Sequence, residues 1–409
     1  MAKKVDDLLE EAQGFYDDED YEEALKYYEK VIKLDNEHID GWNGKGDCLY
    51  EQEEYDDAIK CYNKSLKLDN ENVDAMNGKA NCLYEQGKYE DAIRCYDKTL
   101  KLDEENVCAW SSKGSSLYEL GKYDEALECY DKALEFDEEH VYSMNGRGDV
   151  LYDQEKYDEA LEWYEKALEL DEENVYAWNG KGACLAEQEE YGAAIKCYDK
   201  ALKSDRESIY ALNGRGDCLY EQEEYEEAIK CYDKALKLDE ENVYSLNGKG
   251  DTLSGMEEYN KAIKCYDKVL DIEEDNTYAL TGKGNAFLGQ DKYDEALECY
   301  DRILEIEEDS YYGWYNKGLT LSYQEKYGEA VKCYDKALKI EPDDEDAIKA
   351  REEALAKNPT KDKAKQGKTS QKKPKEKVTE ESPFIKCSYC DGPNERNTPY
   401  CATCRAPLY

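Results

Sequence analysis

The sequence predicts an all-α protein: an α-solenoid of ten 34-residue helix–turn–helix repeats, followed by a small zinc-stapled C-terminal module. Tyrosines recur every 34 residues between residues 5 and 344, with no insertion or deletion. Ala follows each of them at +3 and Tyr follows at +7, which is the spacing of one helix face. All seven prolines lie at or after Pro342, so the repeats are almost free of helix breakers. The recurring tyrosines are Tyr21, Tyr55, Tyr89, Tyr123, Tyr157, Tyr191, Tyr225, Tyr259, Tyr293 and Tyr327.

Each repeat is numbered here from position 1 to position 34. Position 8 is always Gly or Ala and position 20 is always Ala, which allows close approach of helices. Position 34 is mostly Asn, Ser or Asp, the residues that cap helix N-termini. One repeat alone cannot bury its apolar face, so stability must come from contacts between neighbours. The repeats are residues 5–38, 39–72, 73–106, 107–140, 141–174, 175–208, 209–242, 243–276, 277–310 and 311–344.

This pattern resembles the tetratricopeptide repeat family over 340 of the 409 residues. The family motif falls at positions 4, 8, 17, 20, 24 and 27. In one repeat these are Trp178, Gly182, Tyr191, Ala194, Tyr198 and Ala201. The resemblance implies a right-handed solenoid whose first helices line a groove for extended peptides or partner helices. Position 7 departs from the family, because nine repeats have Lys or Arg there in place of Leu. We expect the stems of these cations to pack between helices and their heads to meet carboxylates.

The resemblance makes positions 2, 5, 9, 12 and 13 the candidate groove positions. Asn amides at position 5 can pair with a peptide backbone, and Tyr at position 12 offers amphipathic contact area. Asp at position 9 and the mostly Glu position 13 favour cationic partners. The alternative is that duplication has simply multiplied solvated polar residues. The candidates are Asn43, Asp47, Tyr50, Asn77, Tyr84, Asn145, Asp149, Tyr152, Asn179, Asn213, Asp217, Tyr220, Asn247 and Asp251. The last repeats break this pattern with Leu288, Leu319, Ser322 and Tyr323, which predicts a more apolar stretch.

After the repeats, residues 345–357 read as one capping helix that covers the last apolar face. Residues 358–383 form a basic linker, with no large apolar residue up to Lys377, and we expect it to be disordered. Its lysines act either as a solubilising tether or as a contact for nucleic acid, although no aromatic residue is present to stack on bases.

Four cysteines in residues 384–409 form two Cys-x-x-Cys pairs. Such pairs aim two thiolates at one point and together suit tetrahedral Zn(II). The segment resembles zinc ribbons and, less closely, the Ran-binding-protein type of zinc finger. We therefore predict one structural Zn(II), with unrelated thiols or a redox pair as the alternative. The proposed ligands are Cys387, Cys390, Cys401 and Cys404. The other thirteen cysteines lack ligand spacing and are expected to be packing residues.

The net charge of −44 is uneven, since residues 345–409 carry +4 and residues 1–344 carry −48. The sequence has no signal-peptide pattern and no stretch near the ~20 apolar residues of a membrane span, and its many thiols favour a reducing, cytoplasmic location. We see no nucleophile–base set, and the repeated Gly-Lys-Gly lacks the strand-to-helix context of a phosphate loop.

The predicted function is a non-enzymatic protein-interaction scaffold for basic or extended partner segments, without membrane or small-molecule substrate. The alternative is an RNA- or ribosome-associated factor that uses residues 358–409.

Overall fold

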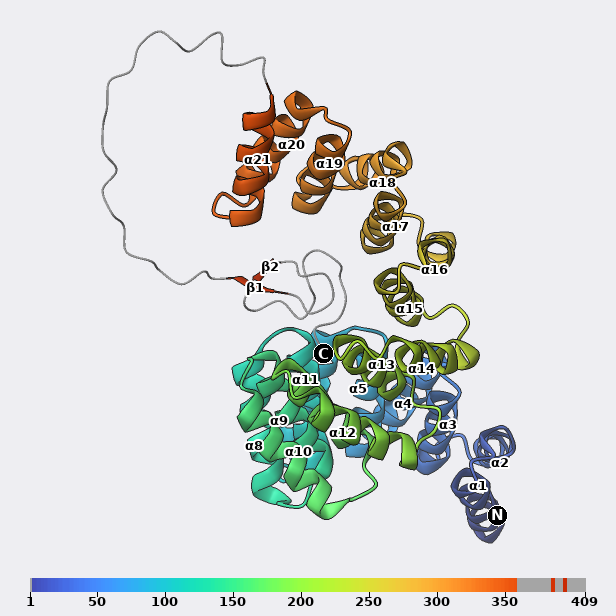
Figure 1. Ribbon diagram of the computed structural model, residues 1–409. Helices are drawn as coiled ribbons and strands as arrows, with labels where there is room; N and C mark the ends of the chain where they lie inside the picture. Colours follow the sequence, from blue (N-terminus) through green and yellow to red (C-terminus); the bar gives the residue numbers. More distant parts are fainter. Residues whose placement is uncertain (1, 359–383, 387–392, 396–409) are drawn as a thin grey trace. The chain divides into compact units, whose positions relative to one another are not determined.

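The computed structural model describes residues 2–358, 384–386 and 393–395 (Figure 1). Over these residues it contains 21 α-helices and one two-stranded antiparallel sheet. The predicted helix–turn–helix pairs are confirmed. The chain divides into two compact units, residues 1–172 and residues 173–409, and each is described by itself. The predicted linker from residue 359 and the four C-terminal cysteines lie outside the described residues.

In unit 1, five helix pairs follow one another, and each helix packs against the next one in the chain. Successive odd-numbered helices also contact each other. The helices are α1 (Ala2–Asp17), α2 (Tyr21–Leu34), α3 (Ile39–Glu51), α4 (Tyr55–Leu68), α5 (Val73–Glu85), α6 (Tyr89–Leu102), α7 (Val107–Glu119), α8 (Tyr123–Phe136), α9 (Val141–Asp153) and α10 (Tyr157–Leu170).

Unit 2 continues the same arrangement with five pairs and one further helix. Its helices are α11 (Val175–Glu187), α12 (Tyr191–Ser204), α13 (Ile209–Glu221), α14 (Tyr225–Leu238), α15 (Val243–Gly255), α16 (Tyr259–Ile272), α17 (Thr277–Gly289), α18 (Tyr293–Ile306), α19 (Tyr311–Tyr323), α20 (Tyr327–Ile340) and α21 (Glu345–Lys357). The two paired strands are β1 (Phe384–Lys386) and β2 (Pro393–Glu395), with Lys386 opposite Pro393. Among the described residues, no helix is long and apolar enough to cross a bilayer.

The helix boundaries follow from local chemistry. At position 34, Asn72 accepts a hydrogen bond of 2.7 Å from the Ala75 N–H and so caps α5. Three residues join the helices of a pair, and the residue at position 15 has a positive φ: 61° at Glu53 and 69° at Gly87. This left-handed residue reverses the chain in a short space. Only three residues are therefore needed between the two helices of a repeat.

The Tyr at position 24 is the centre of each repeat core. A Cβ on Gly46 would lie 2.7 Å from the Tyr62 ring, and one on Gly78 would lie 2.4 Å from it. The ring therefore fills the space between α3 of its own repeat and α5 of the next. The flanking glycines of the Gly-Lys-Gly motif are thus explained by close packing on tyrosine.

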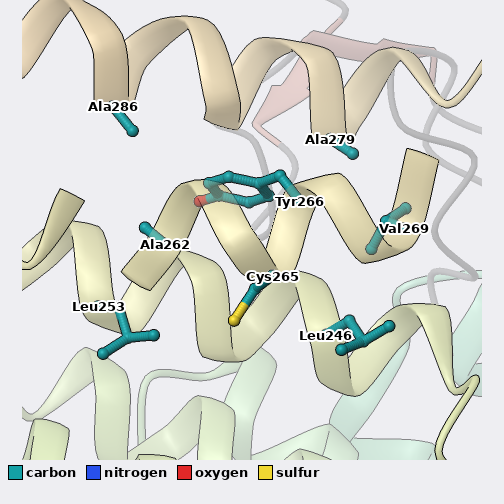
Figure 2. Packing of buried hydrophobic residues seen from close by; sticks show 8 residues of the cluster. All are labelled: Leu246, Leu253, Ala262, Cys265, Tyr266, Val269, Ala279 and Ala286. Carbon is teal, nitrogen blue, oxygen red and sulfur yellow. The ribbon is translucent and has the colours of Figure 1, made fainter. Parts of the chain in front are cut away.

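Figure 2 shows the same arrangement in unit 2, where the Tyr266 ring lies beside the α17 residues Ala279 and Ala286. The Cys265 sulfur points the other way, towards the α15 residues Leu246 and Leu253. Most repeat cysteines are buried in this manner, while Cys95 is half-buried and Cys108 is exposed. The predicted packing role fits these positions.

The cation at position 7 pairs with an acid at position 25 of the preceding repeat. Lys45 lies 2.7 Å from Glu29, and only 23% of its side chain is exposed. Lys79 instead donates to the Asn63 side chain at 2.8 Å. The further pairs are Lys113–Asp97, Arg147–Asp131, Arg215–Asp199, Lys249–Asp233, Lys283–Asp267, Lys317–Asp301 and Arg351–Asp335. The prediction of packed stems and paired heads is confirmed.

The last helix, α21, occupies the place of the first helix of an eleventh repeat. Arg351 makes the position 7 ion pair with Asp335, and Ala347 and Ala354 are buried. At position 8, however, the exposed Glu352 replaces the usual Gly or Ala. A carboxylate there cannot receive a further tyrosine ring, so the helix gives the last repeat a polar outer face.

Candidate partner-binding surface

The position 5 asparagines lie between successive odd helices. Asn43, Asn145 and Asn213 are more than nine-tenths buried, and Asn77, Asn179 and Asn247 are half-buried. The Asn43 Nδ2 donates to Asn72 Oδ1 at 3.1 Å, across the repeat boundary. The Oδ1 atoms of five of these residues are buried without a hydrogen-bond partner among the described residues: Asn43, Asn77, Asn145, Asn179 and Asn247. Sequence spacing predicted their face but not their burial.

The position 9 aspartates connect helices. The Tyr62 hydroxyl donates to Asp47 at 2.7 Å, and Tyr164 and Tyr232 donate to Asp149 and Asp217 at the same distance. In unit 2 the second oxygen of Asp217 also accepts from Tyr244, which belongs to the next repeat, at 2.6 Å. Asp251 is bound in the same way by Tyr266 and Tyr278. Each of these two carboxylates therefore joins three helices.

Burial is the main cause of perturbed acidity at these carboxylates. It raises the pKa of Asp47 to about 6, with smaller repulsions from Asp74 and Glu51 and an opposing hydrogen bond from Tyr62. Burial likewise raises the pKa of Asp251 to about 6. The hydrogen-bonded tyrosines reduce the desolvation cost without removing it. Near neutral pH these aspartates are therefore mostly ionised, and their burial makes that ionised form less stable than it would be in water.

The position 12 tyrosines form pairs with the position 17 tyrosines. The rings of Tyr50 and Tyr55 meet edge to face with centroids 5.7 Å apart, and those of Tyr84 and Tyr89 do so at 5.4 Å. The pairs at Tyr152 and Tyr220 have centroid distances of 5.5 and 5.7 Å to Tyr157 and Tyr225. Tyr152 is buried, whereas Tyr50, Tyr84 and Tyr220 are half-buried. The pairs thus form a semi-exposed aromatic ridge beside the odd helices.

The position 13 acids lie on the predicted groove face, although none of them was named individually as a candidate residue. They are the last residues of α3, α5, α7 and α9. Each accepts a hydroxyl from the preceding repeat: Tyr16 to Glu51 and Tyr50 to Glu85 at 3.3 Å, Tyr89 to Glu119 at 3.5 Å, and Tyr123 to Asp153 at 3.2 Å. Glu119 also accepts from Tyr84, and Asp153 also accepts from Tyr118. A carboxylate at a helix C-terminus opposes the helix dipole, at a cost of ~0.3–1 kcal/mol. An acid at the last residue of every first helix from α1 to α13 is the sequence signal that identifies this row.

The predicted residues come together only within a repeat or between neighbours. Positions 5, 9 and 13 are four residues apart, so Asn43, Asp47 and Glu51 share one face of α3. On α11 the row is interrupted by Ala183. From α15 onward the acids at position 13 give way to Gly255, Gly289 and finally Tyr323; the last is 57% exposed and stacks on Tyr293. The face is therefore acidic from α3 to α9 and aromatic near α19.

Most groups on the acidic stretch are hydrogen-bond acceptors. The tyrosine protons are already donated to carboxylates, and carboxylates and amide oxygens accept only. Such a face favours ligands that bring donors or positive charge. Over the part of the chain that the structure describes, no three His, Cys, Asp or Glu residues are grouped to hold a metal ion.

Sequence-family models match the repeats almost end to end. Models described as tetratricopeptide repeat match residues 9–73, 105–173, 145–209, 209–242, 243–276, 277–310 and 311–344. A model described as anaphase-promoting complex, cyclosome, subunit 3 matches residues 54–133. None of these models describes an enzyme.

Two solved structures resemble parts of the fold. The crystal structure of yeast Tom70 is 16% identical, covers 87% of this chain and 96% of its own, and has a TM-score of 0.47. The crystal structure of YrrB, described as a TPR protein with an unusual peptide-binding site, is 26% identical. It covers 46% of this chain and 97% of its own, with a TM-score of 0.36. A search of curated proteins found no match.

Proposed function

The chain belongs to the tetratricopeptide repeat family, whose repeats act as protein-interaction scaffolds, and from this premise we propose that it is a non-enzymatic adaptor that binds basic, extended segments of partner proteins. The binding surface is the face of the odd helices that carries positions 5, 9, 12 and 13. We assign this role to the face as a whole, with the semi-exposed tyrosines providing contact area and the acids selecting charge.

The observation that carries the proposal is that this face offers mostly hydrogen-bond acceptors and few donors. The acids of α3, α5, α7 and α9 each accept at least one tyrosine proton, and Glu51, Glu85 and Glu119 are exposed to solvent. The position 7 cations do not neutralise them, because those cations pair with position 25 on the other side. A basic segment supplies both the charge and the donors that this face lacks.

Binding of fluorescent peptides to the full chain tests the proposal. An unstructured arginine-containing peptide should bind with an affinity that falls as salt is added, while an acidic peptide of equal length should not bind. Preferential binding of the acidic peptide, or equal binding of both, would refute the assignment of this face.

We also propose that Cys387, Cys390, Cys401 and Cys404 hold one structural Zn(II) in a reducing, cytoplasmic setting. The spacing of these cysteines supports this, because two Cys-x-x-Cys pairs within 18 residues can each direct two thiolates at one metal ion. Thiolates at these positions would supply all four ligands, so the metal would stabilise the segment and not act as a Lewis acid.

Metal analysis of the purified chain tests the zinc proposal. One zinc per chain is expected, and Cys387→Ser or Cys404→Ser should abolish it without changing the helical circular dichroism signal. A chain without zinc refutes the proposal, whereas more than one zinc shows that repeat cysteines bind metal too.

A further inference from the structure

Unit 1 contains four successive position 13 carboxylates that have no positive partner. Glu51, Glu85 and Glu119 are exposed and Asp153 is half-buried, and none makes an ion pair with a Lys or Arg among the described residues. By contrast, the position 25 acids pair with position 7 cations. Each of the four also ends a helix, where the dipole opposes a negative charge, and the partners it has within the fold are tyrosine hydroxyls and not cations.

A second feature of the same face indicates a ligand independently of charge. Asn43 and Asn145 are 8% and 7% exposed, yet the Oδ1 of each lacks a hydrogen-bond partner within residues 2–358. Buried acceptors are rarely left without a donor, because their desolvation is then uncompensated. Asn43 lies about two helical turns before Glu51 on the same face of α3, and Asn145 lies at the same spacing before Asp153 on α9. We call this row of positions 5, 9 and 13 the acceptor stripe.

The repeat spacing sets the register of any extended ligand along this stripe. Successive odd helices in unit 1 are in contact, and contacting helices have axes ~8–10 Å apart. An extended chain advances ~3.3 Å per residue. Three ligand residues therefore correspond to one repeat. Residues of a ligand at every third position would each meet the same set of protein groups.

We infer that unit 1 binds an extended segment with arginine at every third residue, one for each of the carboxylates Glu51, Glu85, Glu119 and Asp153. Arginine suits the site better than lysine, because its planar fork can bind a carboxylate and stack on the neighbouring tyrosine pairs, such as Tyr50–Tyr55. Because the Oδ1 atoms of Asn43 and Asn145 are covered in the free chain, a small shift of these side chains on binding would let backbone N–H groups of the segment supply the donors that they lack. This inference deepens the proposed function and rests on it.

Peptides of equal length and composition separate register from charge. Each contains four arginines in a Gly/Ser background, placed at every second, every third or every fourth residue. The full chain should bind the peptide with threefold spacing at least tenfold more tightly than the other two. Equal affinities would overturn the register while leaving a basic-segment scaffold intact. Failure to bind any of the three would refute the proposed function as well.

Single substitutions identify the carboxylates involved. Glu85→Gln and Glu119→Gln each remove one negative charge, while glutamine can still accept the tyrosine hydroxyl through its Oε1. Each should lower the affinity for the peptide with threefold spacing about fivefold. The melting temperature of each variant should be unchanged or higher than that of the original chain. The control is Glu138→Gln, which removes the same charge at an exposed residue between α8 and α9. An equal loss in the control would show that only net charge matters and would overturn the inference.

Discussion

Position 27 of the repeat shows how strictly the core excludes unpaired polar atoms. It is buried in every repeat, and eight repeats place Ala, Val or Ile there. The exceptions are Ser65 and Thr99, whose hydroxyls are buried without a partner in the described chain. An unsatisfied buried hydroxyl costs ~1–3 kcal/mol. Neighbouring repeats thus provide a direct comparison for the cost of these two atoms.

Thr99→Val should therefore stabilise the protein by about 1 kcal/mol, because it removes the hydroxyl and preserves the shape. Val occupies the same position in two other repeats, at Val31 and Val269. The matched control is Thr252→Val, since the equally buried Thr252 hydroxyl donates to the Gly248 carbonyl at 2.7 Å. Urea denaturation measures both. A stabilisation of equal size in the control would mean that the missing hydrogen bond is not the cause.

The buried carboxylates predict an unusual pH dependence. Burial raises the pKa of Asp47 and Asp251 to about 6 and that of Asp153 to about 7. The folded chain thus binds more protons than the unfolded chain between pH ~4 and ~7. Stability should therefore be highest near the acidic end of this window and fall as pH rises through 6 to 7.

Asp47→Asn tests this origin. Asn81 and Asn285 already accept the position 24 tyrosine hydroxyl at 2.7 Å, so an amide fits the site. At pH 8 the substitution should stabilise by about 1 kcal/mol, after allowance for screening of a half-buried carboxylate, and at pH ~4, close to the pKa of Asp in the unfolded chain, it should be nearly neutral. Melting temperatures at the two pH values measure this. A pH-independent effect would contradict the titration argument.

At the scale of the helices, the repeat spacing was sufficient to predict both helices of every pair. It could not predict the left-handed residue at position 15, because Glu occupies it in most repeats where Gly would be expected. Periodicity also placed positions 5, 9 and 13 on one face but could not tell that Asn43 is buried and Glu51 exposed. That difference depends on the tyrosine of the paired helix and on the following repeat, which are tertiary contacts.

The helix α21 offers a test of repeat stacking. Ala354 is 2% exposed and packs against Leu321, Val331 and Tyr334 of the last repeat. Ala354→Glu should bury an unpaired charge and undock the helix, which would destabilise the end of unit 2 by about 2 kcal/mol or more. Ala356→Glu, on the exposed face of the same helix, is the control. Hydrogen exchange should accelerate first in α20 and α21. Uniform acceleration across unit 2 would contradict neighbour-only coupling.

At the scale of the whole chain, the net charge affects how fast partners are encountered, whereas close contacts determine which partner is bound. The position 7 pairs neutralise acids between repeats, so much of the −48 on residues 1–344 arises elsewhere on the surface, including the position 13 row. Such a field attracts any cation and raises its rate of encounter, but it distinguishes poorly between cations. Discrimination must then come from tyrosine pairs and amides, which act only after contact.

This division predicts how salt acts on binding of an arginine peptide to the full chain. Between ~50 and ~300 mM salt the association rate constant should fall at least tenfold, because screening shortens the reach of the surface field. The dissociation rate constant should change much less, because it reflects the close contacts. Replacing Tyr50 by Phe removes the hydroxyl donated to Glu85 and keeps the ring, so it should alter dissociation more than association. Stopped-flow fluorescence separates the two rates, with an uncharged Gly/Ser peptide as the baseline. If salt acted mainly on dissociation, the positive charges of the partner would be held in buried contacts, and long-range steering would not be the role of the acidic surface.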